Sequence, residues 1–133
     1  MRTTTLGSKG PEFGVIGLGC MGMTFSYDMR TPRDEATSVA VVLPQVSASL
    51  DRGGPPWRST WAPPSSTGPH TNEELVGRAL AGGHRERAVL ATKVGLVVSD
   101  PTGGPGNSPV IVNNGRPEHV RKSIDESLRR LGL

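Results

Sequence analysis

The chain has 133 residues, of which 34% are hydrophobic and 20% are charged, and its formal net charge of +3 comes from scattered arginines rather than from a basic run. This pattern excludes a strong nucleic-acid or membrane-surface footprint, and neither a bilayer-spanning stretch nor an apolar export signal is present, so we expect a cytoplasmic protein. A single cysteine excludes an internal disulfide, and the length is about half of the roughly 250 residues of an eight-unit (β/α) barrel, so the fold is either small or incomplete.

The first predicted feature is a hairpin that leads into a strand. Two short extended runs, Arg2–Leu6 and Phe13–Leu18, flank a turn at Gly7–Gly10. Within the second run, Val15-Ile16 predicts a buried strand that ends in the sequence Gly-Leu-Gly. Residues without bulky side chains at this point indicate that something approaches the backbone closely.

A helix is predicted next, from a cap at Thr31 to Val42. Pro32 suits the first helical position, and Asp34 favours the positive end of the helix dipole. The pattern then stops, because Leu43–Thr67 contains five prolines, five serines and both tryptophans, with no sustained period. No element is predicted there, although a strand hidden in this segment would complete three β/α units.

Order returns with a helix that begins near Thr71. Thr71 and Glu74 have the spacing of a capping box. An apolar stripe precedes a stop at Gly82-Gly83 and is formed by Leu75, Val76, Ala79 and Leu80. A strand follows over Arg87–Val94, apolar on both faces apart from its last residues, as expected of a parallel strand covered by helices.

The last predicted elements are a long loop and a helix. Gly95–Gly115 contains clusters of glycine and proline and is predicted to be a loop. Pro117 begins a helix with one apolar side, formed by Val120, Ile124, Leu128 and Leu131. The exposed side carries two favourable pairs, Glu118 with Lys122 and Asp125 with Arg129. This order of strands and helices indicates an α/β protein with a parallel sheet.

Gly17 to Gly22 match the pattern G-x-G-x-x-G behind a strand, and one interpretation is a Rossmann dinucleotide-binding loop. That loop opens a helix, whereas Met23–Arg30 has no clear apolar stripe, and no acidic residue lies about 20 positions on, near Val42. A structural tight turn is a second interpretation. The third, which the context favours, is a loop closely approached by a ligand in a different α/β fold.

Four motifs resemble the aldo-keto reductases in order and spacing. They are Val15 to Met23, His70 to Leu80, Ala91-Thr92-Lys93, and Arg116 to Val120 with Ser127 to Gly132. The resemblance covers nearly everything except Leu43–Thr67. It implies a partial (β/α)8 TIM barrel in one domain over residues 1–133, with an N-terminal hairpin closing the barrel floor and about three β/α units.

The resemblance also implies a site for NADPH and a small aldehyde or ketone. In that family hydride passes from the nicotinamide to the carbonyl carbon, and a tyrosine protonates the oxygen with help from a lysine, an aspartate and a histidine. An ammonium beside a tyrosine favours the phenolate and makes the proton easier to give. Lys93 matches the family lysine and is the predicted catalytic residue, although a strand-end lysine that simply reaches water is the alternative. Gly19, Cys20 and Met21 match the family's first β/α loop and are the predicted cofactor-binding residues.

The segment before Gly68 departs from the family pattern. The family has a strand there that ends in Asp-x-Ala-x-x-Tyr-Gly, whereas this chain has Ala62–Thr67, with Thr67 at the tyrosine position. We hypothesise that Leu43–Thr67 is translated out of frame, because one permitted codon string for Ala62–Thr67, read two bases later, encodes Ala-Ala-Glu-Leu-Tyr. A true insertion is the alternative.

Two functions remain as hypotheses. One is an NADPH-dependent carbonyl reductase in which Lys93 is the one catalytic position present, and the other is a non-catalytic fragment whose open sheet edges invite association. The family histidine belongs to a strand beyond Leu133. The histidines here share no metal-ligand spacing and predict no metal site; they are His70, His84 and His119. Little or no activity is expected, and the substrate, the choice between NADPH and NADH, and the oligomeric state stay open.

Overall fold

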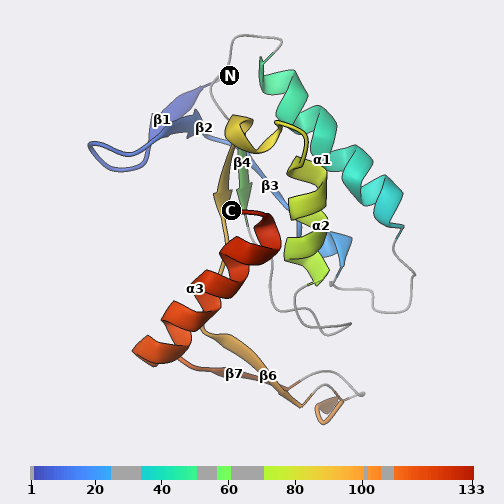
Figure 1. The fold of residues 1–133 in the computed structure, drawn as a ribbon, viewed down its shortest axis with the longest axis vertical. Coiled ribbons are helices and arrows are strands. Elements are labelled where there is room, and N and C mark those ends of the chain that lie inside the picture. Colours follow the sequence, from blue (N-terminus) through green and yellow to red (C-terminus); the bar gives the residue numbers. More distant parts are fainter. Residues whose placement is uncertain (1, 25–33, 51–56, 61–70, 101, 106–109) are drawn as a thin grey trace.

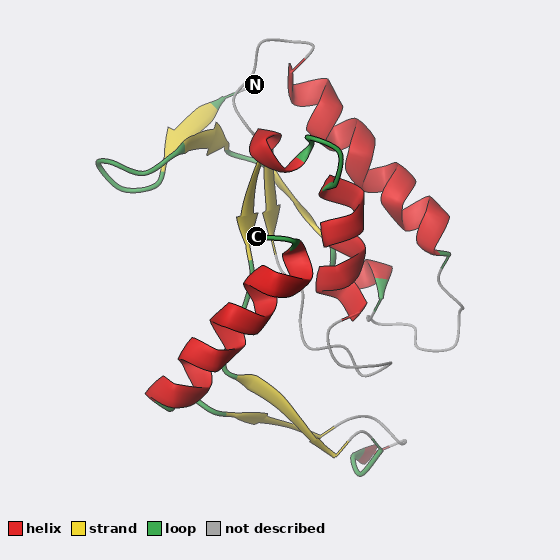
Figure 2. Ribbon diagram, viewed as in Figure 1, coloured by secondary structure: helices red, strands yellow, loops and turns green. Residues whose placement is uncertain are grey.

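The computed structural model describes residues 2–24, 34–50, 57–60, 71–100, 102–105 and 110–133 (Figure 1). Its elements follow in the order β1 (Thr3–Thr5), β2 (Glu12–Gly14), β3 (Gly17–Gly19), the 3-10 turn η1 (Met21–Met23), α1 (Glu35–Leu50), β4 (Trp57–Thr60), α2 (Thr71–Leu80), the 3-10 turn η2 (Arg85–Arg87), β5 (Ala88–Ala91), β6 (Leu96–Asp100), β7 (Val110–Asn113) and α3 (Pro117–Leu131). Figure 2 shows how these helices and strands are distributed in the molecule.

A parallel sheet of three strands positions everything else, and its strand order is β3-β4-β5. β4 lies in the middle, so that Gly19 pairs with Thr60, and Thr60 pairs with Ala91. The three strands therefore end in one row at one edge of the sheet. The predicted α/β class with a parallel sheet is confirmed, and the sequential strand order is consistent with the predicted partial barrel.

The core lies between the sheet and the helices, and α2 occupies the position between α1 and α3 (Figure 1). Its buried side chains come from the sheet, the loop after β3 and all three helices: Cys20, Val42, Leu75, Val76, Ala79, Leu80, Ala88 and Leu131. The predicted apolar stripe of α2 is thus confirmed. The helix ends as predicted, because Gly82 and Gly83 have φ values of 74° and 88°, which residues with a side chain rarely adopt.

The predicted N-terminal hairpin is confirmed, whereas the strand after it is displaced. β1 and β2 pair antiparallel, with Thr4 opposite Phe13. The prediction of a buried strand at Val15-Ile16 was wrong, because these residues lie between β2 and β3 and Ile16 is 67% exposed. The strand begins later than predicted because its pairing with β4 begins at Gly17, which lies opposite Arg58.

Helix α1 differs from the prediction at both ends. It begins at Glu35, and Asp34 caps it by accepting a hydrogen bond from the Thr37 backbone N–H at 2.7 Å. Thr31 and Pro32, predicted to open the helix, lie outside the described residues. The helix also continues past Val42 to Leu50, through Pro44. An interior proline costs about 3 kcal/mol, which is why the sequence predicted a stop. The helix is anchored two residues before this proline by Val42, which is buried in the core.

The sequence predicted no element in Leu43–Thr67 but left a hidden strand open, and the structure has such a strand there. Besides the end of α1, this segment contributes β4, the central strand of the sheet. Trp57–Thr60 has no alternating apolar pattern, so its side chains give no strand signal. Its backbone is paired on both sides, by β3 and β5, and this non-local pairing provides the strand that completes three β/α units.

The described residues of Gly95–Gly115 form a hairpin rather than the predicted loop. β6 and β7 pair antiparallel, and the backbone N–H of Asn114 donates to the Gly95 carbonyl at 2.8 Å where the hairpin closes. Both strands are rich in β-branched residues, a signal that the surrounding glycines and prolines obscured. β5 correspondingly ends at Ala91 instead of Val94.

Helix α3 covers Pro117–Leu131 as predicted, with Pro117 at its start and Gly132 in the left-handed conformation after its end. Its predicted ion pairs are wrong. The pairs within 4.0 Å in this fully described helix instead join Glu126 to Lys122 and Arg130. Of the predicted apolar side, Leu131 is buried, while Ile124 and Leu128 are exposed.

None of the helices in the described part of the chain is long and apolar enough to cross a bilayer.

Candidate functional site

The predicted cofactor-binding residues and the predicted catalytic lysine lie at the same edge of the sheet. Gly19 ends β3, Cys20 follows it, and Met21 begins the 3-10 turn η1. Lys93 lies two residues after Ala91, the end of β5. Gly19 and Ala91 are in one row with β4 between them, and neighbouring strands are about 4.8 Å apart, so roughly 10 Å separates the two strand ends.

The alternation of side chains along β5 places Lys93 on the side of the sheet away from the helices. Ala88 is buried in the core, Leu90 packs against it, and Thr92 reaches α2. Successive residues of an extended chain point to opposite sides, so Lys93 shares the other side with Val89 and Ala91. Lys93 is exposed there.

The loop after β3 is held by a buried amide. Asn72, which is 0% exposed, donates from Nδ2 to the Cys20 carbonyl and to the Thr24 hydroxyl, each at 2.8 Å. The Cys20 thiol is buried as well. The first turn of α2 therefore fixes the path of the loop Gly19–Met21, the predicted cofactor loop.

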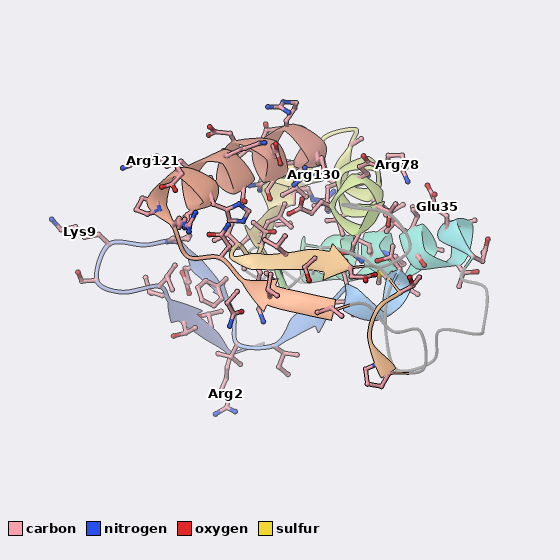
Figure 3. The ribbon with its side chains drawn as sticks, turned by 90° about the horizontal axis from the view of Figure 1, so that it is seen from below. Arg2, Lys9, Glu35, Arg78, Arg121 and Arg130 are labelled. Carbon is pink, nitrogen blue, oxygen red and sulfur yellow. The ribbon has the colours of Figure 1, made fainter. Side chains whose placement is uncertain are left out.

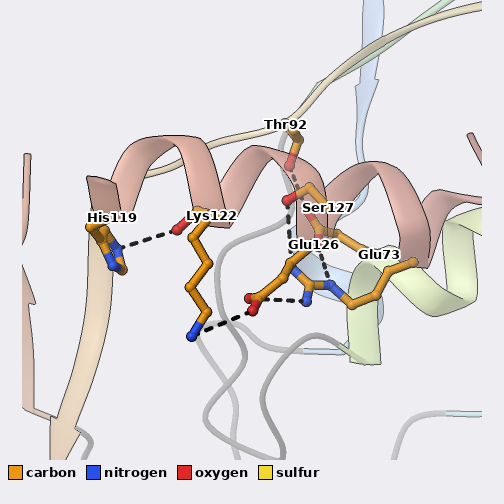
Figure 4. A network of polar contacts seen from close by, with 8 residues as sticks. Glu73, Thr92, His119, Lys122, Glu126 and Ser127 are labelled. Carbon is orange, nitrogen blue, oxygen red and sulfur yellow. Dashed lines mark hydrogen bonds and ion pairs between the residues drawn. The ribbon is translucent and has the colours of Figure 1, made fainter. Parts of the chain in front are cut away.

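The carboxylate of Glu73, next along α2, holds the segment after β5 (Figure 4). Its Oε1 accepts a hydrogen bond from the Thr92 hydroxyl at 2.6 Å, and its Oε2 accepts one from Nε of Arg130 at 2.7 Å. Only 6% of the Glu73 side chain and 16% of the Arg130 side chain are exposed. The network thus joins α2, α3 and the residue before Lys93.

The charge state of Glu73 follows from two opposing effects. Burial raises the pKa of this carboxyl group, but hydrogen bonds from Thr92, Ser127 and Arg130, together with the positive charge of Arg130, outweigh burial and lower the pKa below its ordinary value. Glu73 is therefore an anion at neutral pH, and the Thr92 hydroxyl acts as a donor to it.

Neither Asn72 nor Glu73 was predicted as a functional residue from the sequence. The sequence did carry a signal that these side chains are buried, because the apolar stripe of α2, extended toward the N-terminus of the helix, includes both residues. Asn72 is four residues before Val76, and Glu73 is seven residues before Leu80. Polar residues on a buried stripe need buried partners. The sequence alone does not say which partners these are.

The other polar contacts of the helices have simpler roles. Figure 3 shows Arg78 and Glu35 extending toward each other from α2 and α1, and their ion pair of 2.8 Å is more than half exposed. An exposed pair of this kind contributes at most about 1 kcal/mol.

His119 contacts Ser123 at 3.3 Å within α3. His70 lies outside the described residues, and within these residues no three His, Cys, Asp or Glu side chains form a group that could hold a metal ion.

Comparisons with known proteins agree with the fold. The model of the aldo/keto reductase family matches residues 16–133. The chain is similar to the solved structure of aldo-keto reductase AKR11C1 from Bacillus halodurans in its holo form, with a TM-score of 0.67 and 25% identity. It is also similar to the glycerol dehydrogenase AKR11B4 from Gluconobacter oxydans, with a TM-score of 0.59 and 27% identity. Each match covers 99% of this chain but only 37% and 35% of the respective solved chains, so this chain spans little more than a third of their length.

Proposed function

Because the chain belongs to the aldo/keto reductase family, we propose that it provides part of a site for the NADPH-dependent reduction of a small aldehyde or ketone to an alcohol. The observation that carries this proposal is the register of the parallel sheet. Gly19 and Ala91 end in one row, so that the loop Gly19–Met21 and Lys93 extend from the same edge. Sites in parallel α/β proteins are built at this carboxyl edge of the strands.

The residues at this edge fit the nicotinamide end of the cofactor. A Cβ atom at Gly22 would meet no described atom within 4 Å, so the backbone of the loop after β3 is open to close approach at this glycine. Gly19, Cys20 and Met21 would line the nicotinamide and the substrate. When bound, NADPH supplies the hydride that the carbonyl carbon receives.

Lys93 provides the positive charge of the site. An ammonium group near the carbonyl oxygen stabilises the negative charge that develops there as the carbonyl is reduced. In the family, the lysine also favours the ionised form of the tyrosine that gives the proton. In this chain the tyrosine position is Thr67, which lies outside the described residues. We therefore expect slow reduction at most, with water as the proton source.

A second candidate function is a non-catalytic one, and the residue that favours it is the same Thr67. A threonine hydroxyl is a far weaker acid than a phenol. A chain that binds NADPH but transfers no hydride would have this second function.

The test is to measure NADPH binding, by the fluorescence of the reduced nicotinamide, and NADPH oxidation with a reactive aldehyde. We expect saturable binding and a low rate of oxidation that falls at least about tenfold in Lys93→Met, equivalent to about 1.4 kcal/mol of transition-state stabilisation. Lys122→Met, on exposed α3, is the matched control and should leave both unchanged. Binding without oxidation would support the second candidate, and no binding by the wild-type chain would contradict the proposed function.

A further inference from the structure

We propose that the first turn of α2 positions the candidate site, with Glu73 fixing Lys93 through Thr92 and Asn72 fixing the loop Gly19–Met21 through the Cys20 carbonyl. The inference rests on the proposed function only in treating these residues as a site for NADPH and a carbonyl substrate. The contacts that carry it come from the structure alone.

The segment that carries Lys93 depends on Glu73 for its conformation. The ladder of β5 ends at Ala91, and residues 92 to 94 belong to no helix or strand. The hydrogen bond from the Thr92 hydroxyl to Glu73 orients this segment by drawing the Thr92 side chain to α2. Because neighbouring side chains of an extended segment point to opposite sides, this contact also directs Lys93 to the face away from α2.

Glu73 is held in turn by α3. Its second oxygen accepts the hydrogen bond of Arg130, whose side chain is largely buried, so the carboxylate has a fixed orientation when Thr92 binds it. Charge-assisted hydrogen bonds of this length are the stronger kind. Figure 4 shows the three elements meeting at this carboxylate.

Asn72 acts in the same way on the other segment of the site. Its amide donates to the carbonyl of Cys20, the residue between Gly19 and Met21, and to Thr24 further along the loop. Asn72 and Glu73 are adjacent in one helical turn. The distance between the cofactor loop and Lys93 is therefore set by a single rigid piece of backbone.

The composition of the chain offers two local reporters for a test. Lys93 is one of only three lysines, with Lys9 and Lys122, so ¹³C-methylation of the lysine amines gives a simple NMR spectrum in which Lys93→Arg assigns one signal. Cys20 is the sole cysteine and is buried, so its reaction rate with a thiol reagent reports on the loop.

For the Glu73 arm we compare Thr92→Val, Glu73→Gln and Thr92→Ser with the wild-type chain. We expect the Lys93 signal to differ from those of Lys9 and Lys122 in the wild-type chain and in Thr92→Ser, which keeps the hydroxyl. In Thr92→Val and Glu73→Gln it should shift toward the other two. Glu74→Gln, on the exposed side of the same turn, is the matched control and should change nothing. Thr92→Val retains the size of the side chain, so it decides the question even if Glu73→Gln does not fold.

For the Asn72 arm we expect Asn72→Ala to raise the reaction rate of Cys20 at least tenfold, while Glu74→Gln leaves it unchanged. A Lys93 signal that is the same in the wild-type chain and in Thr92→Val, with only the stability altered, would overturn the Glu73 arm. An unchanged Cys20 rate in a folded Asn72→Ala would overturn the Asn72 arm.

Adding NADPH separates this inference from the proposed function. If NADPH leaves the Lys93 signal of the wild-type chain unchanged while Thr92→Val still shifts it, the positioning holds and the proposed cofactor does not. If NADPH moves the Lys93 signal of the wild-type chain while Thr92→Val without NADPH leaves that signal unchanged, the cofactor binds but the positioning is wrong.

Discussion

The carboxylate of Glu73 is an anion in a nearly closed environment, and its stability depends on keeping all its donors. Thr92 and Arg130 each bind one oxygen. Removing the charge takes from the guanidinium of Arg130 its nearer carboxylate partner, at 2.7 Å, and leaves Glu126 at 3.7 Å. Loss of one partner of a buried ion pair typically costs about 3 to 5 kcal/mol.

We predict that Glu73→Gln lowers the free energy of unfolding by on the order of 3 kcal/mol at neutral pH. Because the pKa of Glu73 is lowered in the folded state, its contribution is fully present above the ordinary value of 4.5 and is lost as the pH falls through the lower folded value. The difference between the wild-type chain and the variant should therefore narrow below about pH 4. Urea unfolding at neutral and acidic pH measures this, with Glu74→Gln as the exposed control. Equal destabilisation at both pH values would mean that the charge of Glu73 is not the cause.

Helices α2 and α3 approach each other through a residue that has no side chain, Gly77. A Cβ atom at Gly77 would lie 2.6 Å from the carbonyl oxygen of Arg130 and 3.2 Å from the Cα atom of Leu131. Both atoms belong to the backbone of α3, so a side-chain rotation cannot relieve the contact. The same helix pair carries the Glu73–Arg130 ion pair, which a shift of α3 would disturb.

We predict that Gly77→Ala destabilises the protein, although alanine is favoured over glycine inside a helix by about 1 kcal/mol. The steric overlap outweighs this preference, and the expected net loss is about 1 to 3 kcal/mol. Thermal unfolding followed by circular dichroism measures it. Gly115→Ala is the control, because a Cβ atom there would meet no atom within 4 Å. A higher melting temperature for Gly77→Ala would show that α3 moves freely relative to α2.

The elements that could be predicted from the sequence are those with local signals. α2 and α3 have apolar residues at helical spacing, a glycine stop and, in α3, a proline start. The hairpin β1–β2 has a glycine-containing turn. β4 has no such signal, because its strand structure comes from partners about 30 or more residues away in the sequence on either side. The same holds for the site: Lys93 and the loop Gly19–Met21 are suggested by motifs, whereas the role of Asn72 and Glu73 depends on contacts that only the fold creates.

The parallel sheet of the protein has two edges, β3 and β5. Within the described residues, β3 and β5 each pair with β4 only, so the outer side of each has unpaired backbone groups. Near them, Ile16 and Val94 are exposed apolar side chains. Open strand edges beside apolar surface favour association with a further strand.

We predict that the 133-residue chain associates as its concentration rises, because edge-to-edge pairing satisfies these groups. Sedimentation velocity over a range of protein concentrations measures this. Val89→Lys, which introduces a charge on the edge strand β5, should reduce the association, whereas Arg121→Lys on exposed α3 should not. A monomer at every concentration would show that the strand edges are protected.

The row formed by Gly19, Thr60 and Ala91 makes the site sensitive to whether residue counts are odd or even. Lys93 lies an even number of positions from Ala91, and this parity sets the face of the sheet to which the Thr92–Glu73 hydrogen bond holds its amine. Deleting one residue between the strand end and Lys93 would turn the ammonium toward α2 and its acidic first turn, while leaving the composition of the region almost unchanged. Single-residue insertions and deletions at this point should therefore be far more damaging than substitutions.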